Sequence, residues 1–312
     1  MADKQATREA YGKALAELGK TNKDLVVLDA DLSKSTKTAE FAKVFPERFI
    51  NVGIAEQNMA CVAAGLATAG KTVFCSSFAM FAAGRAFEQV RNSIAYAELP
   101  VTVAATHSGV TVGEDGATHQ AVEDMAIMRS VPGMTVVVPC DGTEAGKAVT
   151  ALADYDKPAY LRLGRLAVET VTAEETPFEI GKGVVLKNGK DAAVFACGLM
   201  VQEALKAADA LQADGIDVAV VDMHTIKPLD EVLVVEMAGQ CGAVVTAEEG
   251  TVMGGLGSAV AEVLAESCPV PMGRIGVQDS FGESGKPAEL LKKYHLTSED
   301  IAAKVKETIL KK

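Results

Sequence analysis

Glu56 is the residue whose type and position most clearly suggest chemistry, in the segment Gly53-Ile-Ala-Glu-Gln-Asn-Met59. It opens a predicted helix over residues 55–69 that soon becomes almost wholly apolar. Because a helix this apolar is buried, its first turn should lie near the protein interior. The helix N-terminus favours a carboxylate at that position. The residues alone leave two interpretations open, a buried acid that takes part in chemistry and a plain N-terminal charge or capping-box member.

A second group of candidates combines aromatic and imidazole side chains. Phe78 and Phe81 are spaced three residues apart, which on a helix usually means core packing. Two of the four histidines, His107 and His119, fall in one short stretch with the glycine-rich segment GEDGATHQ (113–120). A metal site would need a third ligand in a recognisable pattern, and this stretch offers none. By themselves such histidines could equally be exposed loop residues, although histidine suits proton transfer near neutral pH.

The elements that must position these residues alternate along the chain as short β-rich runs and longer helical patterns. The runs are apolar throughout, as expected of parallel strands covered on both faces. The alternation predicts an α/β fold with two doubly wound domains, each with a mostly parallel sheet. Strands are predicted at 25–29, 72–75, 100–104, 135–138 and 159–161, then at 192–196, 217–221, 243–246 and 274–277. Helices are predicted at 7–19, 55–69, 80–97, 121–129 and 142–153, then at 199–213, 229–238, 256–266 and 287–310.

A polar stretch with one proline and three glycines, residues 169–190, interrupts this alternation. Such a composition is typical of a linker. The predicted division is therefore a first domain over residues 1–168, a linker over 169–190 and a second domain over 191–312.

Polar segments follow three of the predicted strands in the first domain. They are Asp29–Ser33, Ser76–Phe78 and Thr106–Ser108, and the segment 113–120 comes shortly after the third. Ligands of open α/β sheets bind at the carboxyl ends of the strands. We therefore expect these four segments to form one site.

The composition excludes several classes of partner. The formal net charge is −12 and no basic run stands out, which argues against nucleic acid and anionic membranes. The six cysteines are scattered without a CxxC pair, which favours reduced core thiols. The charged N-terminal segment is typical of a helix and not of a signal peptide, and no apolar run reaches the ~18 residues of a membrane span. We expect a cytoplasmic protein.

The segment GIAEQNM, followed by AAGLA, resembles the signature of transketolases and their relatives. The resemblance implies thiamine diphosphate as cofactor, with Glu56 hydrogen-bonded to N1′ of its aminopyrimidine ring to activate it. Phe78 and Phe81 match the phenylalanines that pack against that ring. Full-length members often add a tyrosine three residues on, where this chain has Gly84, followed by Arg85.

The order T-H, five-residue spacer, G-E-D-G-x-T-H-Q is also similar to transketolase. By that resemblance His107 and His119 contact the carbonyl and hydroxyl groups of the substrate, and Asp115 binds the hydroxyl next to the ketone. Four further positions match family contacts. Arg8, Ser35 and Arg165 match contacts to the substrate phosphate, for which the planar arginine fork is suited, and Asp31 matches an aspartate near the thiazolium.

One family motif has no counterpart in this sequence. Transketolases hold the diphosphate and the divalent metal through a G-D-G segment, and this chain contains none. The resemblance therefore covers the pyrimidine-binding and C-terminal domains and implies no metal ligands in this chain. It implies an N-terminal transketolase subunit as partner, which would carry Mg²⁺ and the diphosphate, in an α2β2-type assembly.

The activity implied is transfer of a two-carbon ketol unit from a ketose phosphate to an aldose phosphate. Alternatives are a subunit of a deoxyxylulose phosphate synthase-like or 2-oxoacid dehydrogenase beta-like enzyme, and a non-catalytic paralogue that only assembles with an enzyme. His107 stands where an acidic residue is expected in the synthase, and the GEDGATHQ form is not expected in the dehydrogenase subunit. The intact Glu56 argues against the non-catalytic paralogue.

Overall fold

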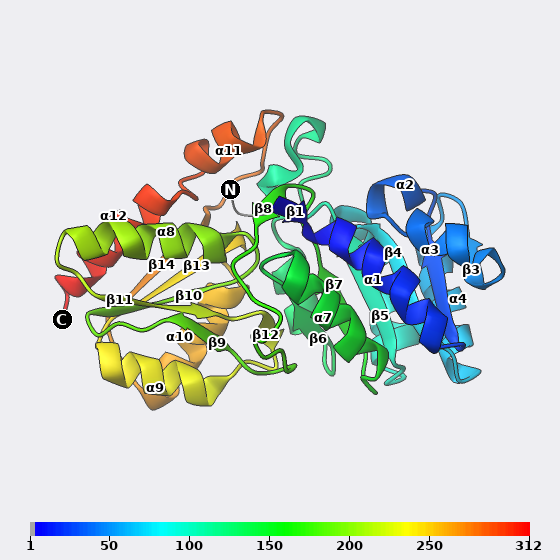
Figure 1. Ribbon diagram of the computed structural model, residues 1–312, viewed down its shortest axis with the longest axis horizontal. Coiled ribbons are helices and arrows are strands. Elements are labelled where there is room, and N and C mark those ends of the chain that lie inside the picture. The colour runs from blue at the N-terminus through cyan, green and yellow to red at the C-terminus, as the bar shows by residue number, and fades with distance from the viewer. Residues whose placement is uncertain (1–3) are drawn as a thin grey trace.

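The computed structural model describes residues 4–312, which form two α/β units, each built on its own sheet (Figure 1). The first sheet has the order β12-β6-β7-β5-β4-β2-β3 and is parallel except for the pair β12–β6. Its strands are β2 (Leu25–Asp29), β3 (Phe49–Asn51), β4 (Thr72–Phe78), β5 (Val101–Thr106), β6 (Thr135–Val137), β7 (Ala159–Arg162) and β12 (Thr225–Lys227).

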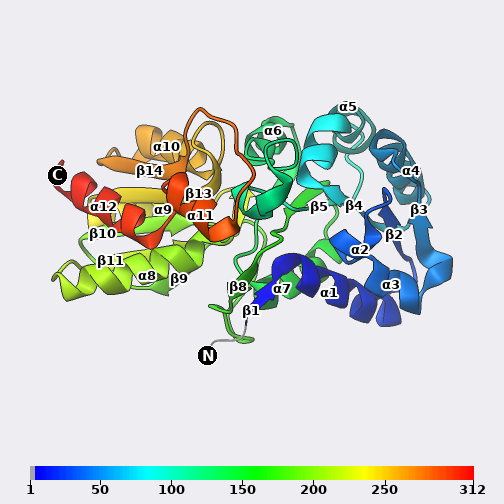
Figure 2. The same ribbon diagram turned by 90° about the horizontal axis from the view of Figure 1, so that it is seen from above.

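Helices cover both faces of this sheet (Figure 2). One face carries α1 (Thr7–Thr21), α3 (Ala39–Val44) and α7 (Gly142–Ala153). The other face carries α4 (Glu56–Thr68), α5 (Phe87–Gln89) and α6 (Asp124–Ser130). The short helix α2 (Ser33–Thr36) follows β2. The helix α4 buries small side chains, Ala60, Ala63, Ala64 and Ala67, which let its backbone approach the sheet closely. The first turn of α4 is thereby held against the interior.

The second sheet has the order β14-β13-β10-β11-β9 and is parallel except for the edge pair β11–β9. Its strands are β9 (Val184–Lys187), β10 (Ala192–Ala196), β11 (Val218–Asp222), β13 (Val244–Thr251) and β14 (Met272–Val277). The helices α8 (Met200–Ala213) and α12 (Ser298–Ile309) cover one face, α9 (Glu231–Cys241) and α10 (Leu256–Ser267) the other, and α11 (Pro287–Lys293) lies toward the first unit (Figure 1). A two-stranded sheet joins β1 (Lys4–Ala6) to β8 (Ala167–Glu169).

The predicted fold class, two α/β units with mostly parallel sheets, is confirmed, and every predicted strand is present. The strands that the sequence did not predict have three or four residues each and lie at sheet edges; they are β1, β3, β8, β9 and β12. The segment 169–190, predicted as a linker, contains β9, which pairs with β11. The division into residues 1–168, 169–190 and 191–312 stays a prediction.

Two predicted helices differ from the structure. The stretch 80–97 is not one α-helix: π-helical turns at Met80–Arg85 and Val90–Ala95 flank α5. The stretch 287–310 is two helices, because the chain turns at His295, where φ is +56°. Among residues 4–312, no helix is both long and apolar enough to cross a membrane.

The two units share a buried polar junction. Arg162, at the end of β7, donates to both carboxylate oxygens of Asp124 at 2.8 and 3.0 Å and to the carbonyl oxygen of Glu249 at 2.9 Å. The Glu249 carboxylate, on β13, accepts a hydrogen bond from the backbone N–H of Thr111 at 2.6 Å. The strand β12 also crosses from the chain of the second unit into the first sheet. The second unit thus helps to position the loop that begins near residue 110.

Replacing Arg162 by alanine should destabilise the protein strongly, because Asp124 would remain buried with no cation beside it. Removing one partner of a buried ion pair costs about 3–5 kcal/mol. Urea unfolding, followed by circular dichroism, measures the free energy of unfolding. Lys43→Ala is the control, since Lys43 forms an exposed pair with Glu40 and exposed pairs contribute about 0–1 kcal/mol. Equal losses of unfolding free energy in the two variants would show that the buried pair contributes no more to stability than an exposed pair does.

Glu249 should make stability depend on pH. Burial raises the pKa of its carboxyl group from 4.5 to about 7. The folded protein therefore keeps a proton that the unfolded chain releases above pH 4.5, so this stabilisation is complete below pH 4.5 and is lost as the pH rises through 7. Glu249→Gln should reduce the fall in unfolding free energy across this window by up to about 1.4 kcal/mol per pH unit.

Urea titrations of wild type and variant at several pH values between 4.5 and 7.5 measure this slope. Some slope will remain, because burial also raises the pKa of Glu248 to about 7 and raises the pKa of Glu144 and Asp222. Glu262→Gln, an exposed carboxyl on α10, is the control. A slope unchanged by Glu249→Gln would show that Glu249 is ionised in the folded protein throughout this range.

Candidate functional site

The predicted site segments lie at one edge of the first sheet, because β2, β4 and β5 are adjacent and parallel. In the ladder Asp29 is opposite Ser76, and Phe78 is opposite Thr106. Ser76, Ser77 and Phe78, predicted to follow a strand, are the last residues of β4 itself. They nevertheless stand at the expected carboxyl end.

Four ring side chains form a cluster at this edge. Phe78 and Phe81 do not share a helix as their spacing suggested: Phe78 ends β4, Phe81 lies in the following π-helical turn, and their ring centres are 5.8 Å apart. The His107 ring stacks on Phe78 at 3.9 Å, and His119 meets the Phe81 ring edge-on at 5.4 Å. The structure therefore brings both predicted histidines to both predicted phenylalanines.

His107 is held in a strained and dry position. Its φ is +57°, a left-handed conformation that few non-glycine residues adopt, and only 4% of the residue is exposed. Burial lowers the pKa of His107 to about 3, with smaller contributions from Arg8, Arg165 and His119. The imidazole is therefore neutral near pH 7. Threonine hydroxyls occupy Nδ1 of both histidines at 2.9 Å, leaving Nε2 of each as the nitrogen available to a ligand.

Glu56 is buried, 1% exposed, in the first turn of α4. The residue before it, Ala55, is the N-cap and provides no side-chain cap, so Glu56 does not belong to a capping box. Instead both carboxylate oxygens accept hydrogen bonds at 2.9 Å from Nη1 of Arg85. The Arg85 guanidinium lies over the Phe81 ring, 4.6 Å from its centre. No role was predicted for Arg85 from the sequence; the available signal was its position directly after Gly84, where the resemblance implied a tyrosine.

The loop after β2 places Asp31 and Ser35. The buried Asp29 carboxylate anchors this loop by accepting from the N–H of Leu32 and the hydroxyl of Thr36, both at 2.6 Å. Asp31 is exposed with φ of +64°. Arg8 donates to the carbonyl oxygen of Ser35 at 2.6 Å, which joins two of the predicted phosphate contacts. Asp29 was not assigned a role of its own, although it is the first residue of the polar segment Asp29–Ser33 that was expected at the site.

The loop that carries Asp115 is a 3-10 turn, η4 (Val110–Asp115), with glycines at positive φ at residues 113 and 116. Arg165 donates to the carbonyl oxygen of Val112 and pairs with Glu114 at 3.1 Å, so it lies on this loop. Asp115 is exposed at the end of the turn. Of the predicted site residues, Glu56, both phenylalanines and both histidines form one contiguous group, and Arg8 and Arg165 lie close enough to His107 to influence its charge.

Within the described part of the chain, Cys140, Glu144 and Asp222 form a group that could hold a metal ion. All three are buried where the two units meet, and none was predicted as a site residue. Burial raises the pKa of all three groups, which favours their protonated, neutral forms. The Glu144 carboxyl group accepts a hydrogen bond from the backbone N–H of Cys140 at 2.7 Å. A structural role, in which the buried groups share a proton, is therefore enough to account for this group of side chains.

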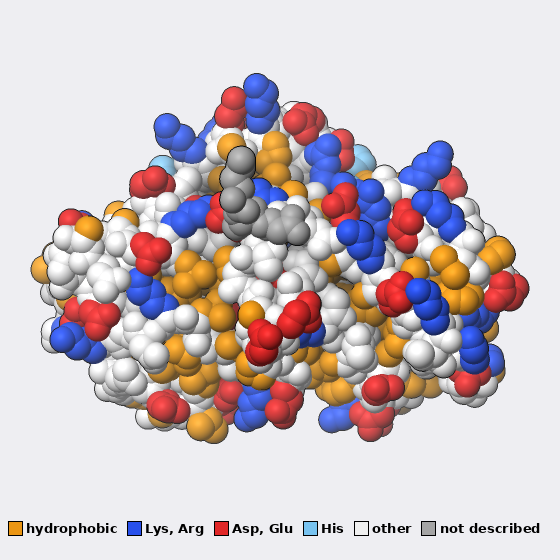
Figure 3. Space-filling view, viewed as in Figure 1, with side chains coloured by type: hydrophobic (Ala, Val, Ile, Leu, Met, Phe, Trp, Pro, Cys, Tyr) orange, Lys and Arg blue, Asp and Glu red, His pale blue; other side chains and the backbone are white. Residues whose placement is uncertain are grey.

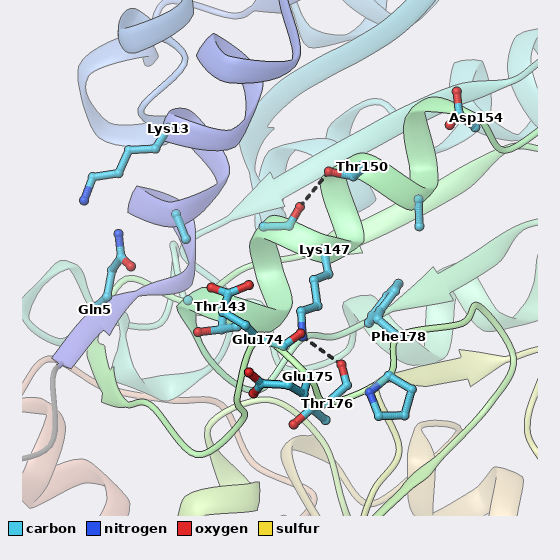
Figure 4. A pocket seen from close by; sticks show the side chains of 15 residues that line it. Gln5, Lys13, Thr143, Lys147, Thr150, Asp154, Glu174, Glu175, Thr176 and Phe178 are labelled. Atoms are coloured by element: carbon cyan, nitrogen blue, oxygen red, sulfur yellow. Dashed lines mark hydrogen bonds between the residues drawn. The ribbon is translucent and has the colours of Figure 1, made fainter.

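An open groove lies elsewhere, between α1, α7 and the segment 174–178 (Figure 4). Lys147 projects into it but donates to the carbonyl oxygens of Ala173, Glu174 and Thr176 at 2.7–2.8 Å. The three N–H donors of its ammonium group therefore already have acceptors. None of the predicted site residues lines this groove. On the face drawn in Figure 3, acidic and basic side chains are interspersed. These features leave the carboxyl edge of the first sheet as the candidate site.

Comparisons with known proteins identify the family to which both units belong. Residues 3–170 match the transketolase pyrimidine binding domain, and residues 181–301 match the transketolase C-terminal domain. A Methanocaldococcus jannaschii protein, provisionally named a transketolase C-terminal section, is 51% identical over 307 residues, 97% of this chain and 96% of that protein. A Clostridium protein, named a 6-deoxy-6-sulfo-D-fructose transketolase subunit, is 43% identical over 98% of this chain and 95% of its own length.

Among solved structures, one described as a split gene transketolase, inactive beta4 tetramer, superposes with a TM-score of 0.93. It is 56% identical in sequence, and the match covers 98% of this chain and 99% of that one. The chain therefore belongs to the transketolase family, and it corresponds to the pyrimidine-binding and C-terminal domains of that family.

Proposed function

We propose that this chain is the C-terminal subunit of a split transketolase, which transfers a two-carbon ketol unit from a ketose phosphate to an aldose phosphate with thiamine diphosphate. The observation that carries the proposal is the buried Glu56 carboxylate beside stacked aromatic rings at a sheet edge. Carboxyl groups placed in dry pockets are typical of catalytic sites. Membership of the transketolase family supplies the cofactor that such a site would take.

The side chains present fit an aminopyrimidine ring. Such a ring needs an apolar face to stack on and a carboxyl group at its edge, which Phe78, Phe81 and Glu56 offer within one cluster. When bound, thiamine diphosphate would supply a nucleophilic carbon for the ketose carbonyl and would accept the electron pair of the neighbouring carbon–carbon bond of the sugar as that bond breaks. Glu56 would hold the proton at N1′ of the ring, and Asp31 would lie toward the thiazolium.

The substrate's polar groups would be handled by His107, His119 and Asp115. His107 is neutral because burial keeps its pKa near 3, so it can donate or accept a hydrogen bond at Nε2 without carrying a charge. His119 is half-buried beside it, and Asp115 is exposed on the neighbouring loop. This arrangement suits a carbonyl and a set of hydroxyl groups that arrive from the solvent side.

The diphosphate and Mg²⁺ would be held by a separate N-terminal transketolase subunit, since this sequence has no G-D-G segment. The face next to Glu56 is suited to a partner: Ile54 is 78% exposed, and Gln57 and Asn58 are also exposed. The beta4 tetramer of the similar split-gene protein is described as inactive, which supports a need for a second kind of chain. We propose an α2β2-type assembly in the cytoplasm.

Phosphate of the sugar would be bound by Arg8, Ser35 and Arg165 at the outer end of the site. The chain as a whole is acidic, so local cations must hold an anionic sugar. Arg8 and Arg165 both lie near enough to His107 to help lower its pKa, which supports the proposal that they serve one site. The name of the Clostridium relative, a 6-deoxy-6-sulfo-D-fructose transketolase subunit, is consistent with an anionic ketose as substrate class.

Reconstitution tests the proposed function. The chain should show no ketol transfer alone, and should become active when mixed with a G-D-G-containing partner subunit, thiamine diphosphate and Mg²⁺. Glu56→Gln should lower kcat of the complex about 100- to 10,000-fold, because an amide cannot exchange the same proton with the ring. A coupled assay of aldose phosphate release measures both. Glu40→Gln, on the surface of α3, is the control and should change little.

Two outcomes would contradict this proposal. Activity of the homogeneous chain without a partner would remove the need for a split enzyme. A Glu56→Gln complex within about threefold of wild type would remove the acid–base role of Glu56, given the size of such contributions.

Arg165→Ala separates a phosphate-binding role from a structural one. A hydrogen bond to a charged group contributes about 1.5–3 kcal/mol, so kcat/KM for a phosphorylated ketose should fall roughly ten- to a hundredfold. Hydroxypyruvate, which has no phosphate to reach the outer channel, should be affected much less. Equal losses for both donors would mean that Arg165 acts by holding the η4 loop through Val112 and Glu114. No loss for either would place the phosphate site on the partner.

A further inference from the structure

Arg85 lies between the two groups that the proposed cofactor would use. Its Nη1 donates to both oxygens of Glu56, and its guanidinium plane covers the face of Phe81. Glu56 is only 1% exposed, whereas the Arg85 side chain is 48% exposed. Arg85 is therefore the solvent-side cover of the Glu56 carboxylate.

The guanidinium group resembles an aminopyrimidine in the features that these two neighbours recognise. It is planar, stacks on aromatic faces and presents N–H groups at its edge. Nη1 of Arg85 bridges both oxygens of the buried Glu56 carboxylate from its solvent side, so a ring nitrogen that approaches from that side meets Arg85 first. The ion pair also requires the ionised form of Glu56, whereas the proposed role requires Glu56 to carry a proton.

We propose that Arg85 is a placeholder for the aminopyrimidine: it occupies the ring's position in the cofactor-free subunit and is displaced when the cofactor binds. The inference rests on the proposed function, and it deepens it by adding a residue that sets cofactor affinity. Arg85 ends a π-helical turn and follows the small, exposed Gly84, so its long side chain can swing into solvent. Single π-helical turns are frequent at functional sites.

Displacement must oppose cofactor binding, because the Arg85–Glu56 contact has to be broken first. A ligand's apparent affinity falls by the fraction of protein that is in the competent state. The contact joins a buried carboxylate to a half-exposed cation, so its contribution lies between that of an exposed pair and that of a buried one. Removing it should tighten cofactor binding about three- to tenfold.

Calorimetric titration of thiamine diphosphate, with Mg²⁺ present, into the reconstituted complex tests this inference. Arg85→Ala and Arg85→Gln should each lower the dissociation constant about three- to tenfold relative to wild type. In a Glu56→Gln background, Arg85→Ala should change the dissociation constant less than twofold, because the amide forms no ion pair with the arginine. Lys71→Ala is the matched control: Lys71 is 40% exposed, pairs with Asp24 at 2.8 Å and lies at the opposite end of β4.

The inference would be overturned if both Arg85 variants bound thiamine diphosphate with unchanged or weaker affinity, since Arg85 would then support the bound state or do nothing. It would also be overturned if Arg85→Ala tightened binding equally with Glu56 and with Gln at position 56. If Arg85→Ala unfolds, Arg85→Gln alone decides the result. Absence of binding to the wild-type complex would instead reject the proposed function, so the two failures are distinguishable.

Discussion

The buried ion pair between Arg162 and Asp124 is the contact on which the site's geometry depends. Arg162 ends a strand of the first sheet, Asp124 begins the helix that follows the η4 loop, and the same guanidinium reaches the backbone of Glu249 in the second sheet. A buried arginine needs a carboxylate beside its charge and an acceptor for each of its N–H donors. The three elements that supply these groups therefore have little freedom to move relative to one another. The second unit thereby acts as a fixed support for the loop from Thr111 onward, whose N–H bonds to Glu249.

Within that support, the candidate site combines groups that are costly to hold in place. His107 has a left-handed backbone conformation and a neutral, buried ring, and Glu56 is a carboxylate with almost no solvent contact. Such strain persists only where the surrounding structure determines it strongly, and it is concentrated at functional sites. The Arg85–Glu56 pair relieves one of these costs, because it neutralises a buried charge.

The positions of the central strands along the chain and the segments that carry the candidate residues were predictable, because both depend on local sequence. Apolar runs such as Leu25–Asp29 and Ala192–Ala196 coincide with the observed strands. The short edge strands were not predictable, since three residues such as Thr225–Lys227 form a strand only when a neighbour offers unpaired backbone groups. The spacing of Phe78 and Phe81 suggested one helix, and the strand proved to extend to Phe78 because its backbone pairs with β5 as far as Thr106.

The sequence by itself determined that the chain forms two α/β units, that Glu56 opens a buried helix, and that His107 and His119 follow one of the parallel strands. Only the tertiary structure decided which groups touch: that Arg85 covers Glu56, that His107 stacks on Phe78, and that Glu249 holds Thr111 from 138 residues away. The physical reason is that strand and helix formation follows from neighbouring residues. Ion pairs and hydrogen bonds between distant residues form only after both units have packed and excluded water from the space between them.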